Sequence, residues 1–180
     1  MQLTRTIIEA MAEGYESYKF TCLLEQYGIW KRYTGCLGFP SGHTAKTAHI
    51  DDKSAMIIDA CSQRLKEHSS FKGSKDKNDK YHYGPYKVYW LFYGTDFTLD
   101  DIRYRLNPCP EKNDRIAKRM RRKNGIVRGP RYYGVDPAFA ETLYRAGPDA
   151  YLMIKRLGDA KMYGFLYELH NNKDNKNEKL

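Results

Sequence analysis

The spacing of hydrophobic residues predicts a chain built from helices. Between residues 3 and 12, the apolar side chains at helical spacing are Leu3, Ile7, Ile8 and Met11. After Gly14, a second set shares one side of a longer stretch and comprises Leu23, Leu24, Tyr27 and Trp30. Both sets are typical of helices that turn one face toward a core.

The stretch "DDKSAMIIDACSQRLKEH" at residues 51–68 shows the clearest amphipathic pattern. Its apolar face comprises Ile57, Ile58, Cys61 and Leu65. Asp51 or Asp52 precedes this face, where an acidic side chain caps the first turn and opposes the helix dipole. The polar, lysine-rich residues 69–80 predict a mobile linker after the helix.

Beyond the linker, residues 86–93 are apolar on nearly every side. Tyr86, Tyr89, Trp90 and Tyr93 fall at helical spacing, and Val88, Leu91 and Phe92 cover most of the remainder. A short helix of this kind is usually central to a small bundle. Gly94 is expected to end it.

Two further helices are predicted before residue 126. Thr98 and Asp101 have the capping-box form, and the helix they begin is expected to bury Leu99, Ile102 and Leu106 before Pro108 and Pro110 end it. The next helix is expected to begin near Asn113, to bury Ile116, Ala117 and Met120, and to end at Gly125.

The remaining pattern completes an all-α prediction. Residues 138–169 hold two or three helical pieces punctuated by Gly147, Pro148 and Gly158. The predicted regions are an N-terminal helical region (1–68), a polar linker (69–80), a helix-turn-helix (81–130), a C-terminal helical extension (131–170) and a disordered tail (171–180). The fold class is therefore a helical bundle that contains a helix-turn-helix, with additional helices at both ends.

Composition adds a partner class to this picture. The 180 residues carry 31 Lys and Arg against 22 Asp and Glu, a formal net charge of +9, which favours a polyanionic partner. No apolar run approaches the roughly 18 residues that span a bilayer, and the N-terminus has no long apolar core of a secretory signal. The expected location is therefore the cytoplasm, with no membrane partner.

The cysteines and histidines offer little chemistry. Cys22, Cys36, Cys61 and Cys109 are far apart, which is typical of reduced thiols. His43 and His49 lie between Cys36 and Cys61, so a zinc site is conceivable, but the spacing fits no finger pattern. The sequence therefore predicts no metal and no cofactor.

Most of the candidate chemistry lies in the stretch "NDRIAKRMRRKNGIVRGPR" at residues 113–131. On the helix predicted there, the apolar residues share one side and Arg115, Lys118 and Arg122 project from the other. In a helix-turn-helix the second helix enters the major groove of DNA, so Asn113 and Arg115 are expected to read base edges. The other predicted DNA-binding residues are Lys118, Arg119, Arg121, Arg122 and Lys123, with further backbone contacts at Lys112, Arg128 and Arg131. The alternative is a solvated basic face on an ordinary bundle helix.

Three segments in this order resemble the phage Q-type late-gene antitermination proteins, in the short class that lacks a zinc ribbon and has a helix-turn-helix like sigma region 4. They are "LLEQYGIW" at 23–30, "DDKSAMIIDACSQRLK" at 51–66 and "IAKRMRRKNGIVRG" at 116–129. The resemblance covers about residues 20–130. The chain departs from the short class in its first 20 residues, in the 50 residues after Val127 and in the linker at 69–80.

The resemblance implies a non-enzymatic transcription factor in a bacterial host cell. Such proteins bind a DNA element at the late promoter, load onto paused host RNA polymerase with its sigma factor, and narrow the RNA exit channel so that terminator hairpins are hindered. By resemblance, the DNA-reading role falls on Asn113, Arg115, Lys118, Arg119 and Arg122. Nascent RNA and a second copy of the chain on DNA are left open as further partners.

Two alternatives remain open on sequence. One is a helix-turn-helix activator of late genes that acts at initiation only. The other is a nuclease or phosphatase that uses His43, His49 and Asp51 or Asp52 with a metal in the glycine-rich loop.

Overall fold

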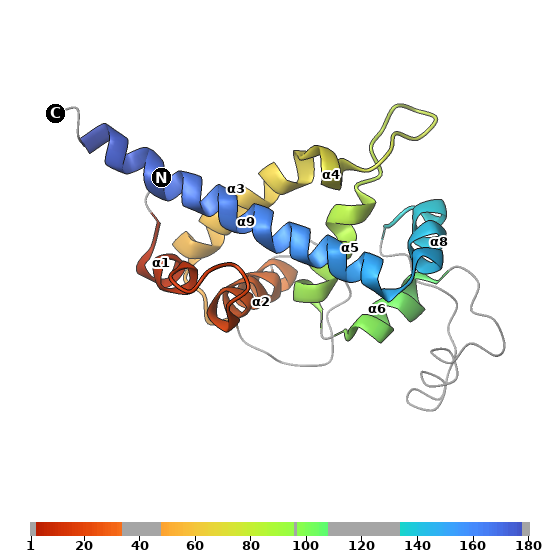
Figure 1. Ribbon diagram of the computed structural model, residues 1–180, viewed down its shortest axis with the longest axis horizontal. Coiled ribbons are helices and arrows are strands. Elements are labelled where there is room, and N and C mark those ends of the chain that lie inside the picture. Colours follow the sequence, from red (N-terminus) through yellow and green to blue (C-terminus); the bar gives the residue numbers. More distant parts are fainter. Residues whose placement is uncertain (1–2, 34–47, 96, 108–133, 178–180) are drawn as a thin grey trace.

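The computed structural model describes residues 3–33, 48–95, 97–107 and 134–177, and in these ranges the regular structure is entirely helical. The eight helices found there pack into an elongated bundle (Figure 1). They are α1 (Arg5–Met11), α2 (Tyr18–Tyr33), α3 (Asp52–Glu67), α4 (Ser69–Lys72), α5 (Gly84–Gly94), α6 (Leu99–Leu106), α8 (Pro137–Ala146) and α9 (Pro148–Asn177). The all-α prediction is confirmed for the described ranges.

The aromatic helix α5 is the centre of the bundle. It packs against α2, α4, α6 and α9, and it begins at Gly84 and ends at the predicted Gly94. Trp90 is fully buried, with its ring 5.0 Å from that of Tyr27 and 4.9 Å from that of Tyr89. A Cβ at Gly28 would meet the carbonyl oxygen of Tyr93, so glycine is what allows α2 to lie this close to α5. The side chains of α5 therefore enter cores on several sides, as the sequence predicts.

The first three helices form the N-terminal part of the main core. Ile7 on α1, Leu24 and Tyr27 on α2, and Ile58 on α3 are fully buried there. Ile8 was expected on the same face as Ile7 but is 43% exposed. Adjacent residues of a helix point about 100° apart, and α1 buries only the face that carries Ile7, Ala10 and Met11.

Helix α3 begins as the sequence predicts. The Asp51 side chain accepts a 2.8 Å hydrogen bond from the backbone N–H of Ser54 and a 2.6 Å hydrogen bond from its hydroxyl.

A polar contact joins α2 to the middle of α3. Lys31 and Tyr27 on α2 both donate to the carboxylate of Asp59 on α3, Tyr27 at 2.7 Å.

Residues 69–80, expected as a mobile linker, contain ordered structure. Phe71 on α4 is fully buried, with its ring 6.0 Å from that of Tyr89. The Asp76 carboxylate then accepts hydrogen bonds from the backbone N–H groups of Asn78 and Lys80 and closes a turn. The buried Phe71 ring and the Asx turn at Asp76 therefore order a segment whose composition is otherwise that of a linker.

A second, smaller core lies on the opposite side of α5. Its buried members are Val88, Leu91, Ile102, Leu106, Val135, Ala140, Leu143 and Tyr151. They come from α5, α6, α8 and the first turn of α9, together with Val135 just before α8.

Helix α9 runs along the bundle and joins both cores. Figure 1 shows it crossing in front of α3 and α5, with its C-terminal end extending past α1 and α3. Gly147 and Pro148 separate α8 from α9 as predicted, but Gly158 does not break the helix. A Cβ at Gly158 would overlap the ring of Tyr89, so this glycine permits close packing of α9 on α5. The helix also continues to Asn177, past the predicted start of a disordered tail at 171, because each residue added to an existing helix gains a backbone hydrogen bond at little cost.

Candidate nucleic-acid interface

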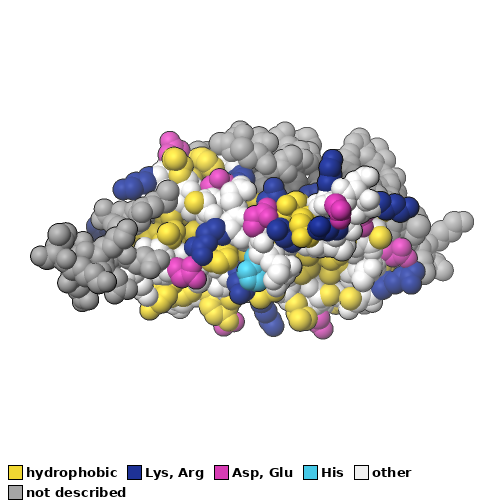
Figure 2. Space-filling model, turned by 90° about the horizontal axis from the view of Figure 1, so that it is seen from above, with side chains coloured by type: hydrophobic (Ala, Val, Ile, Leu, Met, Phe, Trp, Pro, Cys, Tyr) yellow, Lys and Arg dark blue, Asp and Glu magenta, His cyan; other side chains and the backbone are white. Residues whose placement is uncertain are grey.

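Residues 108–133 carry most of the excess positive charge of the chain. These 26 residues contain nine Lys and Arg and two Asp and Glu, a net +7 out of +9. The other 154 residues are nearly balanced, with 22 basic and 20 acidic side chains. On the face drawn in Figure 2, Lys and Arg side chains are correspondingly interspersed with Asp, Glu and hydrophobic side chains. Any polyanion that binds through net charge is therefore expected to contact 108–133, which we call the basic segment.

The predicted DNA-binding residues all fall in this segment and lie outside the described residues. They are Lys112, Asn113, Arg115, Lys118, Arg119, Arg121, Arg122, Lys123, Arg128 and Arg131. The helix predicted from 113 to 125, and with it the second half of the helix-turn-helix, is likewise outside the described ranges.

The structure places the residues on either side of the basic segment. Leu106 and Asn107 precede it and are buried, and Val135 shortly after it is buried as well. Leu106 and Val135 belong to the same second core. The residues that flank the basic segment therefore lie in one core, which α5, α6 and α8 build.

Helix α6, the predicted first helix of the helix-turn-helix, has the expected cap. The Thr98 hydroxyl accepts from the backbone N–H of Asp101 at 3.2 Å, and the Asp101 carboxylate accepts from the backbone N–H of Thr98 at 3.0 Å. Ile102 and Leu106 are fully buried as predicted, whereas Leu99 is only half-buried. The helix that leads into the basic segment is thus fixed at its start by the cap and along one side by the second core.

The pattern of the sequence did not single out two cations on α6. The Arg103 guanidinium lies over the Tyr144 ring at 5.6 Å, and that of Arg105 lies over the Phe97 ring at 4.2 Å. Both residues are half-buried, so the rings hold their charges close to the start of the basic segment. The two arginines are visible in the sequence as "RYR" within a short amphipathic helix. The aromatic rings that they contact lie outside this helix.

Lys87 on α5 contacts the residue that follows the basic segment. Its ammonium group donates to the carbonyl oxygen of Gly134, the first described residue after the segment. Partial burial, and then the nearby charge of Lys66, lower the pKa of Lys87 below its ordinary value. Gly134 has φ +73°, a left-handed conformation that favours glycine at this turn.

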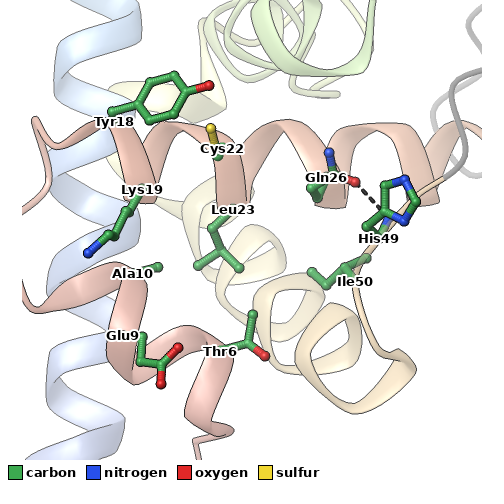
Figure 3. Close-up of a pocket in the computed structure, with 10 residues that line it drawn as sticks. All are labelled: Thr6, Glu9, Ala10, Tyr18, Lys19, Cys22, Leu23, Gln26, His49 and Ile50. Atoms are coloured by element: carbon green, nitrogen blue, oxygen red, sulfur yellow. Dashed lines mark hydrogen bonds between the residues drawn. The ribbon is translucent and has the colours of Figure 1, made fainter.

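A separate cavity of about 280 Å³ opens between α1, α2 and residues 49–50 (Figure 3). Two of its polar side chains have partners within the chain: Gln26 accepts from the backbone N–H of His49 at 2.7 Å, and Lys19 pairs with Glu13. Cys22 and Leu23 contribute to the otherwise apolar lining. The surface that the cavity presents is therefore mostly apolar.

The residues considered for metal chemistry have structural partners. Asp51 caps α3, and Asp52 accepts from the indole N–H of Trp30 at 3.2 Å. Burial raises the pKa of the Cys61 thiol to about 11, which keeps it protonated at neutral pH. Among the described residues there is no group of three or more potential metal ligands, and Cys36 and His43 lie outside those ranges.

None of the helices within the described ranges is long and apolar enough to cross a bilayer. No family model, curated protein or solved structure matches the chain.

Proposed function

We propose that the chain is a nucleic-acid-binding transcription factor that contacts DNA through the basic segment at 108–133. The observation that carries this proposal is the distribution of charge, since 26 residues hold seven of the nine net positive charges. Phosphate contacts by Lys and Arg supply much of the affinity of DNA-binding proteins, and they require such a local excess.

The placement of the flanking residues supports a folded reader over a loose arm. Leu106 before the basic segment and Val135 after it belong to the second core, and the helix before the segment is capped by Thr98 and Asp101. A reader needs fixed attachment points of this kind, because bases are distinguished only when side chains keep a fixed position relative to the groove. On this proposal, Asn113 and Arg115 read bases while Lys118 and Arg122 contact phosphates.

Within this class, we propose late-gene antitermination as the specific activity. The protein would bind an element near a promoter, load onto paused host RNA polymerase and hinder terminator hairpins at the RNA exit channel. The support is the resemblance of three segments, at 23–30, 51–66 and 116–129, to the phage Q-type antitermination proteins.

In vitro transcription separates this activity from activation at initiation. A bound element is first selected from a pool of random duplexes with the full-length protein, and it is then placed at a promoter upstream of an intrinsic terminator. Antitermination predicts longer transcripts only on templates that carry the element. More transcripts with unchanged termination would instead identify an initiation activator.

A matched pair of variants ties the activity to the basic segment. Lys118→Gln with Arg122→Gln removes two charges from the segment and is expected to abolish readthrough. Lys75→Gln with Lys77→Gln removes two charges from the turn after α4, where Lys75 is half-exposed, and is expected to leave readthrough intact. Equal readthrough by the two double variants would exclude the basic segment as the DNA contact.

A further inference from the structure

Helix α9 has a second apolar face, opposite the face that enters the cores. Tyr151, Met162 and Leu166 point inward and are fully buried. At about 100° per residue, five other residues fall within an arc of roughly 80° on the outer side. We call them the α9 stripe: Met153, Leu157, Ala160, Gly164 and Tyr167. A surface helix needs only one apolar face, so the stripe requires a separate explanation.

The large side chains of the stripe are exposed. Met153 is 69% exposed, Leu157 41% and Tyr167 51%. In Figure 1 this helix passes in front of α3 and α5. Among the described residues, the other large exposed hydrophobic side chains, Ile8, Tyr15, Tyr18 and Met56, form no comparable line along one helix.

The spacing within the stripe is that of a helix-pairing seam. Its positions 153, 157, 160, 164 and 167 are separated by four, three, four and three residues. This alternation is the heptad pattern that keeps an apolar seam facing a partner helix along its length. A flat protein surface or a small ligand would impose no such period.

The shape of the stripe suits close helix packing. Its third and fourth residues, Ala160 and Gly164, are small, and a Cβ at Gly164 would meet nothing within 4 Å. Small residues at a crossing point let two helices approach closely, while larger ones fill the space on either side. Tyr167 at one end is already held in place, because its ring stacks on Tyr163 at 6.3 Å and Tyr163 packs edge-on against Phe20 at 5.5 Å.

We propose that the α9 stripe is a self-association surface through which two copies of the chain pair, stripe against stripe. A partner must present an exposed apolar seam of the same period, and a second copy presents one. The five stripe residues carry no charge, so the stripe is unsuited to nucleic acid, whose binding requires cations. A two-fold pair uses the same patch on both copies and leaves no open end, so the expected product is a dimer.

The expected dimer is weak. The stripe spans 14 residue steps, or roughly 21 Å, which gives an interface at the small end of the range for specific complexes. We therefore expect a dissociation constant on the order of 1–100 µM and a concentration-dependent mixture of monomer and dimer.

Sedimentation of the full-length protein, without nucleic acid, from about 1 to about 200 µM tests this proposal directly. The wild-type chain is expected to shift from monomer to dimer across this range. Leu157→Glu and, separately, Met153→Glu are each expected to raise the dissociation constant at least about tenfold, because a carboxylate cannot be buried in an apolar seam without a partner. Two variants are used so that a folding defect in one, checked by circular dichroism, leaves the other as the test.

Met56→Glu is the matched control, since Met56 is 61% exposed on α3 and lies outside the stripe. It is expected to dimerise like the wild type. A wild-type chain that stays monomeric at every concentration would overturn the proposal, as would a dimer that tolerates both stripe variants or is weakened equally by Met56→Glu. The proposal does not rest on the proposed function, and its failure would leave DNA binding by the basic segment untouched.

Discussion

The hydroxyl of Tyr93 on α5 donates a 2.6 Å hydrogen bond to the carboxylate of Asp159 on α9. Tyr89 donates to the same oxygen at 3.1 Å, and Lys155 donates to the other oxygen at 2.9 Å. Asp159 is buried, so its charge depends on these three donors for stabilisation. Burial, and then the nearby charge of Asp159, raise the pKa of Tyr93 well above its ordinary value, so the hydroxyl remains a donor at every ordinary pH.

Replacing Asp159 should therefore weaken the joint between α5 and α9. We expect Asp159→Ala to lower the free energy of unfolding by about 2–4 kcal/mol, because two buried hydroxyls and an ammonium group lose their acceptor. Asp159→Asn should cost less, since its amide oxygen still accepts from the tyrosines. Urea unfolding measures both. Equal stability of Asp159→Ala and the wild type would show that water replaces the carboxylate.

Two glycines on α9 provide a paired test of the packing. A Cβ at Gly158 would overlap the Tyr89 ring, whereas one at Gly164 would meet nothing. Gly158→Ala is expected to destabilise the protein by about 1–3 kcal/mol through overpacking. Gly164→Ala is expected to stabilise it by about 0.5–1 kcal/mol, because alanine is the better helix former. Thermal unfolding of the two variants should shift in opposite directions, and a shared direction would contradict the assigned packing.

The same glycines show where the sequence was informative. Helix caps and amphipathic helices depend on residues that are close together in the sequence. The sequence therefore predicts α3, α5 and α6 together with a cap or an end of each. Gly158 was interpreted as a break because glycine disfavours helices locally. Its actual role depends on the Tyr89 ring, 69 residues away in the chain, which no local pattern reveals.

In residues 69–80 and in the candidate interface, too, the sequence pattern did not reveal contacts between side chains from different elements. Composition predicted a linker, yet Phe71 alone anchors α4 in the core. For the interface, the sequence identified the basic segment and the cap of α6, but not the rings of Phe97 and Tyr144 over Arg105 and Arg103. The reading helix itself, from Asn113 onward, stays a prediction from sequence.

The capping box of α6 should contribute measurably to stability. Thr98→Ala removes the hydroxyl that accepts from Asp101, and we expect it to cost about 1 kcal/mol. Thr142→Ala is the control, because the Thr142 hydroxyl donates to the carbonyl oxygen of Ala138 within α8, where alanine is the better helix former. Denaturant midpoints should fall for the first variant only. A fall for both would indicate a general sensitivity to threonine loss.

The cap of α3 should make stability sensitive to acid. Hydrogen bonds from the Ser54 hydroxyl, and then from its backbone N–H, hold the pKa of Asp51 below its ordinary value of 3.8. A lowered pKa in the folded state means that this stabilisation is fully present above about pH 4 to 5 and is lost as pH falls through the folded value. Asp51→Asn keeps a capping oxygen but does not titrate, so the stability difference between wild type and variant should shrink from pH 7 to pH 3. A difference that stays constant over this range would show that the charge of Asp51 does not matter.

The most direct test of nucleic-acid binding through the basic segment is the salt dependence of affinity for a duplex of random sequence, measured by fluorescence anisotropy. If about six phosphates are neutralised, raising salt from about 50 to about 200 mM should weaken binding by roughly a thousandfold. Lys118→Gln with Arg122→Gln should reduce the slope of log affinity against log salt by about two, and Lys75→Gln with Lys77→Gln should leave it unchanged. An affinity that hardly responds to salt, or a slope that responds equally to both double variants, would contradict the assignment.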